Sequence, residues 1–419
     1  MLLVSVFNVN AQVRTLDFYL KAAKINSPLI NKSENETKIA QLDLAQLKSR
    51  LSKPLISLES SVLFAPIIAH DNSSGRFKWI SNGANDYSGY DQAVTDGGQY
   101  QAVIAVTQPL FNKTKLQTYS SKTELTKKID NNAIVLTIHE LRQLVTRQYI
   151  LCLRSEMQKQ NKVALLKEMN EQLGIMQKLV EGGIYKQADL ILMQIAAQNY
   201  QIEIETFQSE YQSSLSDLNL LCGINDTTMV DLQKISLQTA PAIITRSKFI
   251  TAYKLDSLNL ISGQKISELN YKPQINWVTN AGLNAVYRPS LNRIGFSTGL
   301  TFSYPLFDGN QRKIQREKTA VHLTAIEFEK QKFLTQTAIE KNKIISQIHF
   351  LDQRINRTND QLKKYDQLLG IYSRELSRGE LSVIDYKNVF RDIASKQQEN
   401  ILLKTEKQLL INSYQYWNY

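Results

Sequence analysis

The 419-residue sequence is poor in the residues that interrupt helices, with only 16 glycines and 8 prolines. Proline lacks an N–H and clashes with the preceding helical turn, so helix interiors exclude it. Residues 110–240 and 306–419 contain no proline. Two segments, each more than 100 residues long, are therefore free to be helical. Six of the prolines lie in or beside two other regions: Pro54, Pro66, Pro109, Pro273, Pro289 and Pro305.

Cysteine and histidine are also scarce. Cys152 and Cys222 form no CxxC pair, and no cysteine near the N-terminus offers a lipid-attachment site. In the helical hairpin described below, the two thiols would differ in height by roughly 12 Å, which is too far for a disulfide. We therefore expect two free thiols. We also expect no metal site, because four scattered histidines show no ligand spacing: His70, His139, His322 and His349.

Long apolar runs are missing as well. No stretch reaches the roughly 18 apolar residues of a transmembrane helix, so any membrane insertion must use strands. Residues 1–11 form a short apolar run that ends in Val-Asn-Ala. This run fits the small-residue cleavage rule, with Gln12 as the mature N-terminus. Its basic region is missing and its apolar part is short. We interpret residues 1–11 as a partial signal peptide, with a buried N-terminal strand as the alternative.

The net charge of +11 does not gather into one block of sequence. Lys and Arg are interleaved with Glu, Gln and Asn, which favours a solvated helical surface over a nucleic-acid interface. We find no Walker loop, nucleophile elbow, metal cluster or pair of catalytic carboxylates. We therefore expect no enzyme activity, no catalytic residue, no cofactor and no nucleic-acid partner.

Four stretches alternate between apolar and polar residues: 54–66, 98–109, 273–287 and 293–305. Their polar positions are mostly Gly, Ser, Thr, Asn and Gln, which suit a water-filled lumen, and nothing nearby offers to cover their apolar positions. This favours transmembrane β-strands over an ordinary sheet with one wet face. Barrels start at about eight strands and lipid tolerates no open sheet edge, so the barrel must be shared between subunits. Residues 67–97 are expected to form a long exposed loop.

The remaining segments show helical periodicity. Residues 15–50 and 245–270 are expected to form leading helices. A long helix over 112–181 would span roughly 105 Å, so it must pack along partners as a coiled coil. Gly182 and Gly183 interrupt it, and a helix over 186–221 then turns back as a hairpin. The second hairpin is predicted over 310–417.

The sequence contains an internal duplication. Gln108-Pro109-Leu110-Phe111-Asn112 matches Tyr304-Pro305-Leu306-Phe307-Asp308-Gly309, with an offset of 196 residues. The same offset relates Gly183 to Gly379 and Asp189 to Asp385. We predict a helix–strand–strand–long helix–helix unit that occurs twice. The first repeat spans 12–222, a connector spans 223–244, and the second repeat spans 245–419.

The duplicated strand–Pro-Leu-Phe–helix junction, with the paired Gly-x5-Asp turns, resembles the outer-membrane efflux protein (TolC) family over about residues 15–417. The resemblance implies a membrane α+β fold and a homotrimer. The fold would combine a shared 12-stranded β-barrel, four strands per subunit, with a periplasmic α-helical tunnel of long antiparallel coiled-coil helices. The protein would then be the outer-membrane exit duct of a tripartite efflux or type I secretion system, with a large periplasmic portion. Drugs, metal ions and proteins all leave through members of this family.

The resemblance also implies partners and sites. The partners are a periplasmic adaptor (membrane fusion) protein, an inner-membrane transporter and outer-membrane lipid. Pro109, Phe111, Pro305, Phe307, Asp308 and Gly309 would form the strand–helix junctions. Gly182, Gly183 and Gly379 would mark the periplasmic tips that dock on the adaptor. Asp189 and Asp385 would form the pore constriction, where three-fold copies of a carboxylate attract cations.

Two departures and two alternatives remain open. The first junction has Asn112 in place of Asp-Gly, and Asn388 stands where the family's best-studied pattern has a second acid. Asp189 and Asp385 could instead be ordinary helix caps, since an acid after a glycine turn accepts backbone N–H bonds. The alternative for the whole protein is a periplasmic coiled-coil scaffold without a membrane barrel.

Overall fold

The computed structural model describes residues 13–64, 67–70, 76–78, 86–89, 98–239, 247–285, 292 and 294–419. The expected signal peptide over 1–11 and part of the connector lie outside these residues. The chain divides into two compact units. The helical unit comprises Met1–Glu34, Asn131–Ala252 and Phe328–Tyr419, and the sheet unit comprises Asn35–Asp130 and Tyr253–Glu327.

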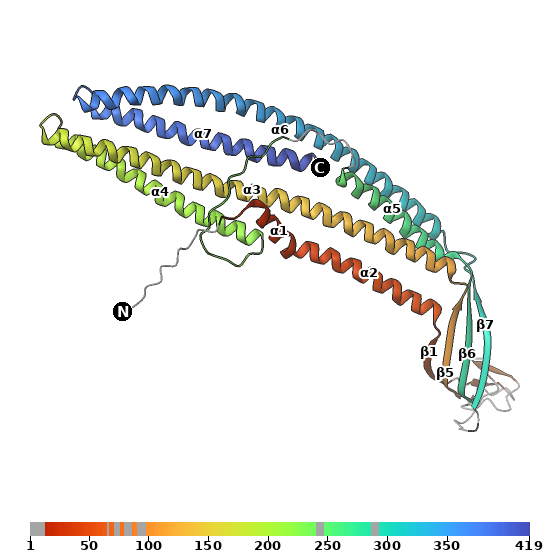
Figure 1. Cartoon of the computed structure of the whole chain (residues 1–419). Helices are drawn as coiled ribbons and strands as arrows, with labels where there is room; N and C mark the ends of the chain where they lie inside the picture. Colours follow the sequence, from red (N-terminus) through yellow and green to blue (C-terminus); the bar gives the residue numbers. More distant parts are fainter. Residues whose placement is uncertain are drawn as a thin grey trace, which may run out of the picture. The chain divides into compact units, whose positions relative to one another are not determined.

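The sheet unit contains a four-stranded antiparallel sheet with the order β1-β5-β6-β7 (Figure 1). Its strands are β1 (Leu55–Phe64), β5 (Gly98–Leu110), β6 (Gln274–Ala285) and β7 (Ile294–Ser303). β1, β6 and β7 lie within alternating stretches of the sequence, and β5 ends one residue beyond the stretch 98–109. Within the described chain, β1 and β7 each have one strand neighbour, so both edges of the sheet are open.

The register separates apolar from polar side chains. Leu58 lies opposite Ile104, Ile104 opposite Ala281, and Ala281 opposite Phe296. Directly opposite residues share a face of a sheet, so this line continues one apolar face across all four strands. The large residues on that face are exposed: Ile56, Leu58, Val62, Ile104, Trp277, Ile294, Phe296, Leu300 and Phe302. The other face carries mainly Ser, Thr, Asn and Gly from the same strands.

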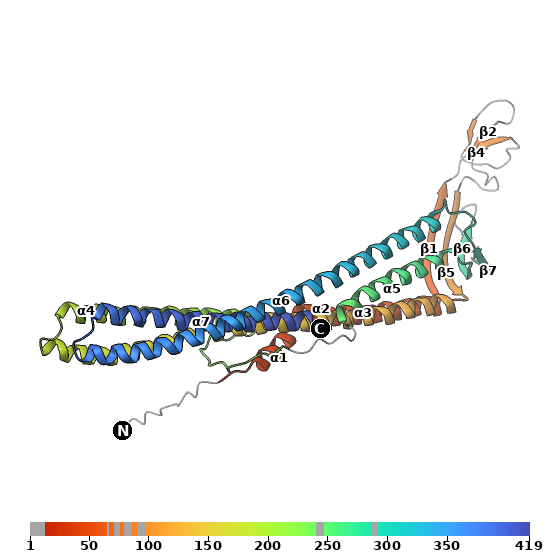
Figure 2. The same cartoon turned by 90° about the horizontal axis from the view of Figure 1, so that it is seen from above.

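The expectation of a plain loop over residues 67–97 was wrong in part. Three short strands, β2 (Ile67–Ala69), β3 (Arg76–Lys78) and β4 (Tyr87–Gly89), form a second small sheet with the order β3-β2-β4. Two of these strands, β2 and β4, are labelled in Figure 2. Each strand has only three residues. Such a segment is too short to show the alternation that identifies a strand in sequence.

Two helical hairpins dominate the helical unit (Figure 1). One consists of α3 (Lys113–Glu181) and α4 (Gln187–Leu221), and the other of α6 (Gln311–Ser377) and α7 (Val383–Trp417). Residues of both hairpins share one buried cluster, because each helix presents an apolar stripe that must be covered. Its members include Leu165, Met169, Met176, Leu190, Met193, Leu376, Val383, Tyr386, Phe390 and Ile393.

The single leading helix expected over 15–50 is in fact two helices, α1 (Leu16–Asn26) and α2 (Pro28–Ser52). Ser27 between them is extended, with ψ 117°. Pro28 causes this break, because proline disfavours a helical conformation in the residue before it while suiting the first turn of the next helix. In the second repeat, α5 (Lys248–Glu268) continues into a 3₁₀ turn over Leu269–Tyr271.

A second buried cluster joins α1, α3, α4 and the connector in the helical unit. It contains Tyr19, Tyr149, Cys152, Tyr211, Leu218, Cys222 and Val230. Both cysteines are free, as expected, and both are buried. Burial raises the pKa of each thiol to about 12. No helix among the described residues has a segment long and apolar enough to cross a membrane.

Candidate functional site: strand–helix junctions and hairpin tips

The first junction links the end of α2 to the start of α3. The Asn112 side-chain amide donates hydrogen bonds to the carbonyl oxygens of Leu51, at 2.9 Å, and of Pro109, at 2.7 Å. The Gln108 amide also donates to Leu51, at 3.2 Å. Leu51 lies in the last turn of α2, where carbonyls lack intrahelical partners. Asn112, which departs from the family pattern, therefore supplies a hydrogen-bond donor to a carbonyl at the C-terminal end of α2. The sequence motif did not indicate this contact.

Phe111 in the first junction has a left-handed backbone, with φ 56°, and its side chain is 85% exposed. Phe307 in the second junction is 84% exposed. Both aromatic residues of the repeated Pro-Leu-Phe motif therefore point away from the protein's own core. Large apolar side chains that are exposed in this way mark surfaces that another protein or lipid can cover.

The second junction turns through two consecutive left-handed residues, Gly309 with φ 63° and Asn310 with φ 67°. Glycine adopts this conformation without steric cost and asparagine tolerates it, which explains the Asp-Gly-Asn sequence. The Asp308 carboxylate accepts a hydrogen bond from the backbone N–H of Arg312, at 2.8 Å. This bond is the main reason that the pKa of Asp308 lies below its ordinary value. Asp308 therefore caps α6.

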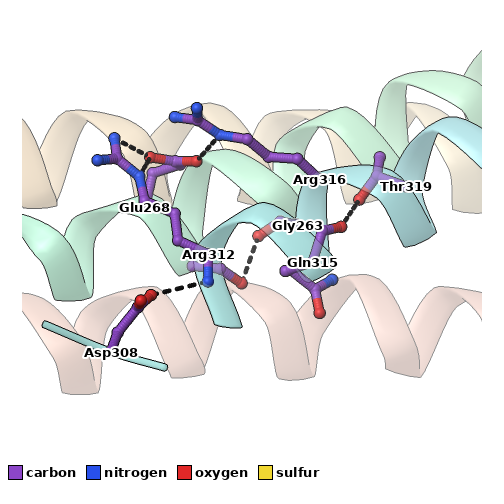
Figure 3. Close-up of polar contacts among 8 residues, drawn as sticks. Gly263, Glu268, Asp308, Arg312, Gln315, Arg316 and Thr319 are labelled. Atoms are coloured by element: carbon purple, nitrogen blue, oxygen red, sulfur yellow. Dashed lines mark hydrogen bonds and ion pairs between the residues drawn. The ribbon is translucent and has the colours of Figure 1, made fainter. Parts of the chain in front are cut away.

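Glu268, the last residue of α5, binds two arginines of α6 (Figure 3). Arg312 Nε donates to one carboxylate oxygen at 2.7 Å, and Arg316 Nε donates to the other at 2.6 Å. The hydrogen bonds from Arg316 and Arg312 lower the pKa of Glu268 to about 2. The sequence analysis missed this cluster, and its only local signal is the pair of arginines one helical turn apart.

Both hairpin tips end their long helix with the same glycine cap. The N–H of Gly183 donates to Val180 at 2.9 Å and that of Ile184 to Leu179 at 2.8 Å. In the second hairpin, Gly379 donates to Leu376 at 3.1 Å and Glu380 donates to Glu375 at 3.0 Å. These paired bonds form a Schellman motif, which needs a left-handed residue. Gly183 and Gly379 supply it, with φ 74° and 77°. Gly182 directly precedes the first of these turns.

The two acidic residues expected at a pore constriction lie in the first turns of α4 and α7 but have different surroundings. The Asp189 carboxylate accepts a hydrogen bond from the backbone N–H of Lys186, at 3.1 Å, so it acts as a cap. The helix start at α7 is capped instead by Ser382, whose hydroxyl accepts from the N–H of Ile384. Asp385 is exposed, and its carboxylate makes no hydrogen bond or ion pair to the residues that the structure describes.

No group of three or more His, Cys, Asp or Glu side chains in the described part of the chain is placed to hold a metal ion. The junctions connect strands to long helices through ordered turns, and the two hairpin tips place two turns next to each other. An antiparallel sheet with an exposed apolar face, joined by such junctions to paired helical hairpins, is the fold of outer-membrane efflux channels.

Comparison with solved structures supports this class. The chain is similar to the outer-membrane protein VceC of Vibrio cholerae, with 14% identity and a TM-score of 0.69, covering 96% of this chain and 95% of VceC. It is similar to CusC, with 11% identity and a TM-score of 0.72, covering 100% and 95%. It is also similar to the MtrE channel of Neisseria gonorrhoeae, with 11% identity and a TM-score of 0.64, covering 96% and 88%.

No family model matches the sequence, and no curated protein matches it. The resemblance to the TolC family that the sequence motifs indicated is thus confirmed at the level of the fold.

Proposed function

We propose that the protein is the outer-membrane exit duct of a tripartite efflux or type I secretion system. It would conduct substrates passively from an inner-membrane transporter across the periplasm and the outer membrane. The energy for transport would come from that transporter. The whole-chain likeness to VceC, CusC and MtrE supports the fold on which this proposal rests.

One observation carries the proposal: the four-stranded sheet exposes its apolar face. Phe296 on that face is 71% exposed and Phe302 is 68% exposed. In water, such an apolar surface would be unfavourable by about 25 cal/mol per Å², whereas acyl chains would cover it. The opposite face, with its Gly, Ser, Thr and Asn residues, suits a water-filled lumen.

The open edges of the sheet support a shared barrel. Lipid cannot satisfy the unpaired N–H and C=O groups of an edge strand. If β7 of one copy pairs with β1 of the next, three copies close a 12-stranded barrel with no free edge. The long helices and the leading helices of each copy would then continue as a periplasmic tunnel.

The remaining sites take roles within this assembly. The tips around Gly182, Gly183 and Gly379 would dock on a periplasmic adaptor. Asp189 and Asp385 would narrow the pore near those tips, with Asp385 supplying the freer carboxylate. Pro109, Phe111, Pro305, Phe307, Asp308 and Gly309 would set the border between barrel and tunnel.

The test is the mass of the protein extracted from isolated outer membranes, measured by light scattering with correction for bound detergent. A trimer released only by detergent supports the shared barrel. A monomer or dimer released by a salt or osmotic wash would overturn the proposal and favour a periplasmic coiled-coil scaffold.

A further inference from the structure

The sheet unit contains a pocket of about 460 Å³ at the border between strands and helices. Its lining comes from α2, α3, the 3₁₀ turn after α5, and the ends of β1, β5 and β6. Figure 1 shows the border where these helices and strands meet. Three cationic residues line it, Arg50 from α2, Lys115 from α3, and Lys272 just before β6, and no acidic residue does. The pocket therefore combines positive charge from three separate elements without an internal counter-charge.

None of these three cations has an acidic partner among the described residues. The ion pairs of the described chain include neither Arg50 nor Lys115 nor Lys272. The second junction provides the contrast, because Arg312 and Arg316 there are bound to Glu268 and Lys313 lies 3.9 Å from Glu317. The positive charge of the pocket is thus available to an outside anion.

The cations of the pocket belong to a wider basic collar. Residues 48–54, 112–116, 265–273 and 308–318 are the segments in which helices meet the four long strands. Together they hold eleven Lys and Arg against three Asp and Glu, a net charge of +8 within the chain's +11. The charges are dispersed in sequence, but the fold brings them to one border.

Part of the pocket wall is apolar and part is polar and uncharged. The apolar part consists of Leu47, Leu51, Leu55, Leu110, Phe111, Leu269 and Ile275, and the polar part includes Thr107, Asn112, Thr114, Gln274 and Asn276. Leu110 lies opposite Ile275 in the β5–β6 register and both continue the apolar face of the sheet. An inorganic anion would bind the cations but would make no favourable contact with the apolar part of the wall. An amphipathic anion would contact both the cations and the apolar residues. Of the strand residues in the wall, only Leu55 belongs to the edge strand β1, and the others belong to the inner strands β5 and β6.

We propose that this pocket binds the headgroup of an anionic phospholipid, with its acyl chains along the apolar face near Leu110 and Ile275. The Arg50 guanidinium and the two ammonium groups would hold the phosphate. The proposal rests on the proposed function, since it requires the sheet to lie in a bilayer with its helix-side border at the headgroups. The bound lipid would fix the height of the sheet in the membrane.

Trp277 is a built-in reporter, because it lies two residues beyond Ile275 on β6 and therefore shares a face of the sheet with this residue of the pocket wall. In a Trp79→Phe, Trp417→Phe background, Trp277 is the only tryptophan left of the three. The full-length protein would be reconstituted into phosphatidylcholine bilayers that contain either dibrominated phosphatidylglycerol or dibrominated phosphatidylcholine at the same mole fraction. Bromine quenches tryptophan fluorescence on contact, so the quenching reports which lipid lies beside the pocket.

We expect phosphatidylglycerol to be preferred over phosphatidylcholine by about fivefold or more, the effect of a single basic residue near an anionic surface. The Arg50→Gln, Lys115→Gln, Lys272→Gln variant should lose this preference. The matched control, Lys265→Gln, Lys313→Gln, Lys318→Gln, removes three charges from the same collar outside the pocket and should keep it. Circular dichroism and oligomer mass establish that both variants fold and assemble.

The outcomes separate the two proposals. Equal quenching by both lipids, or equal loss in both triple variants, would overturn the lipid site while leaving the barrel intact. Quenching by neither lipid would mean that the sheet does not enter the bilayer, which contradicts the proposed function itself. Inorganic phosphate added in solution provides a further test. If it abolishes the preference for phosphatidylglycerol but chloride at equal ionic strength does not, the pocket is a site for a soluble anion and the lipid proposal is wrong.

Discussion

The hydroxyl of Tyr185 donates a hydrogen bond to the backbone carbonyl of Leu381, 2.7 Å away and 196 residues further along the chain. This separation equals the offset of the internal repeat, so the two residues occupy equivalent positions in the two copies. The hydroxyl oxygen also lies 3.1 Å from the carbonyl oxygen of Leu376. A single side chain of the first tip thus holds the main chain of the second on both sides of its turn.

Replacing Tyr185 with Phe should loosen the contact between the tips. The ring still fills its place, but the Leu381 carbonyl loses the hydroxyl that donates to it, which costs about 1 kcal/mol. We expect backbone amides of 379–386 to exchange with solvent about fivefold faster, measured by hydrogen–deuterium exchange. Tyr372→Phe is the control, because Tyr372 packs on the same cluster and its hydroxyl has no hydrogen bond in the described chain. Equal effects of both substitutions would contradict the assigned role.

Gly379 should tolerate substitution less well than Gly183, although both have positive φ. An added Cβ at Gly379 would lie 2.5 Å from Cγ2 of Ile184, whereas one at Gly183 would meet nothing within 4 Å. Gly183→Ala should therefore cost only the left-handed backbone strain, about 1 kcal/mol, and Gly379→Ala should cost more. Thermal unfolding would measure both.

Two further variants separate the steric from the conformational contribution to the loss of stability in Gly379→Ala. Ile184→Ala should recover part of the loss in the Gly379→Ala background, as a double-mutant cycle would detect. Gly370→Ala, in the interior of α6 with open space around it, should be neutral or stabilising. Destabilisation by Gly370→Ala as large as that by Gly379→Ala would contradict the explanation.

The Glu268 cluster should make the stability of the sheet unit depend on acid pH. The ordinary pKa of Glu268 is 4.5, and its two arginine partners lower it to about 2 in the folded protein. A carboxylate with a depressed folded pKa stabilises the fold above its unfolded pKa and loses that contribution as pH falls toward the folded pKa. The Glu268 contribution should thus be full above pH 5 or so and decline between about 4.5 and 2.

The comparison of Glu268→Gln with the parent isolates this contribution from other titrating groups. We expect the variant to be less stable by about 1 kcal/mol near neutral pH, and the difference to shrink below pH 4.5 in urea titrations followed by circular dichroism. A difference that stays constant down to the lowest pH would mean that packing, and not charge, explains the loss.

The long elements of this fold could be predicted because their signals repeat over many residues. β6 and β7 alternate for 12 and 10 residues, and α3 has no internal proline over 69. The break at Pro28 was missed because a proline at the first turn starts a helix as readily as it ends one. The strands β2, β3 and β4 have only three residues each, which is too few to show an alternation of apolar and polar residues.

The contacts that organise the junctions and tips could not be predicted. Glu268 and Arg316 are 48 residues apart, and Tyr185 and Leu381 are further apart still. No local pattern links such partners, because the fold alone brings them together. Glycine turns were different: a positive φ restricts the residue type strongly enough that Gly183, Gly309 and Gly379 stood out in the sequence.

Asp385 should contribute more to ion selectivity than Asp189, provided that three copies surround one pore. The Asp385 carboxylate is exposed and makes no bond within the described chain, so its charge is directed to solvent. A ring of such carboxylates attracts cations and excludes anions.

Asp385→Asn should lower the cation-to-anion permeability ratio, measured as the reversal potential of single channels in a salt gradient. Because the Asp189 carboxylate is already bonded to the Lys186 N–H, Asp189→Asn should change selectivity less, and it should keep the cap because the asparagine amide oxygen can accept the same hydrogen bond. The control is Asp360→Asn, which removes an exposed acid of α6 that is paired with Lys363 at 3.2 Å and should leave the reversal potential unchanged. If Asp360→Asn shifts the potential as much as Asp385→Asn, then only the net charge of the tunnel matters and the constriction lies elsewhere.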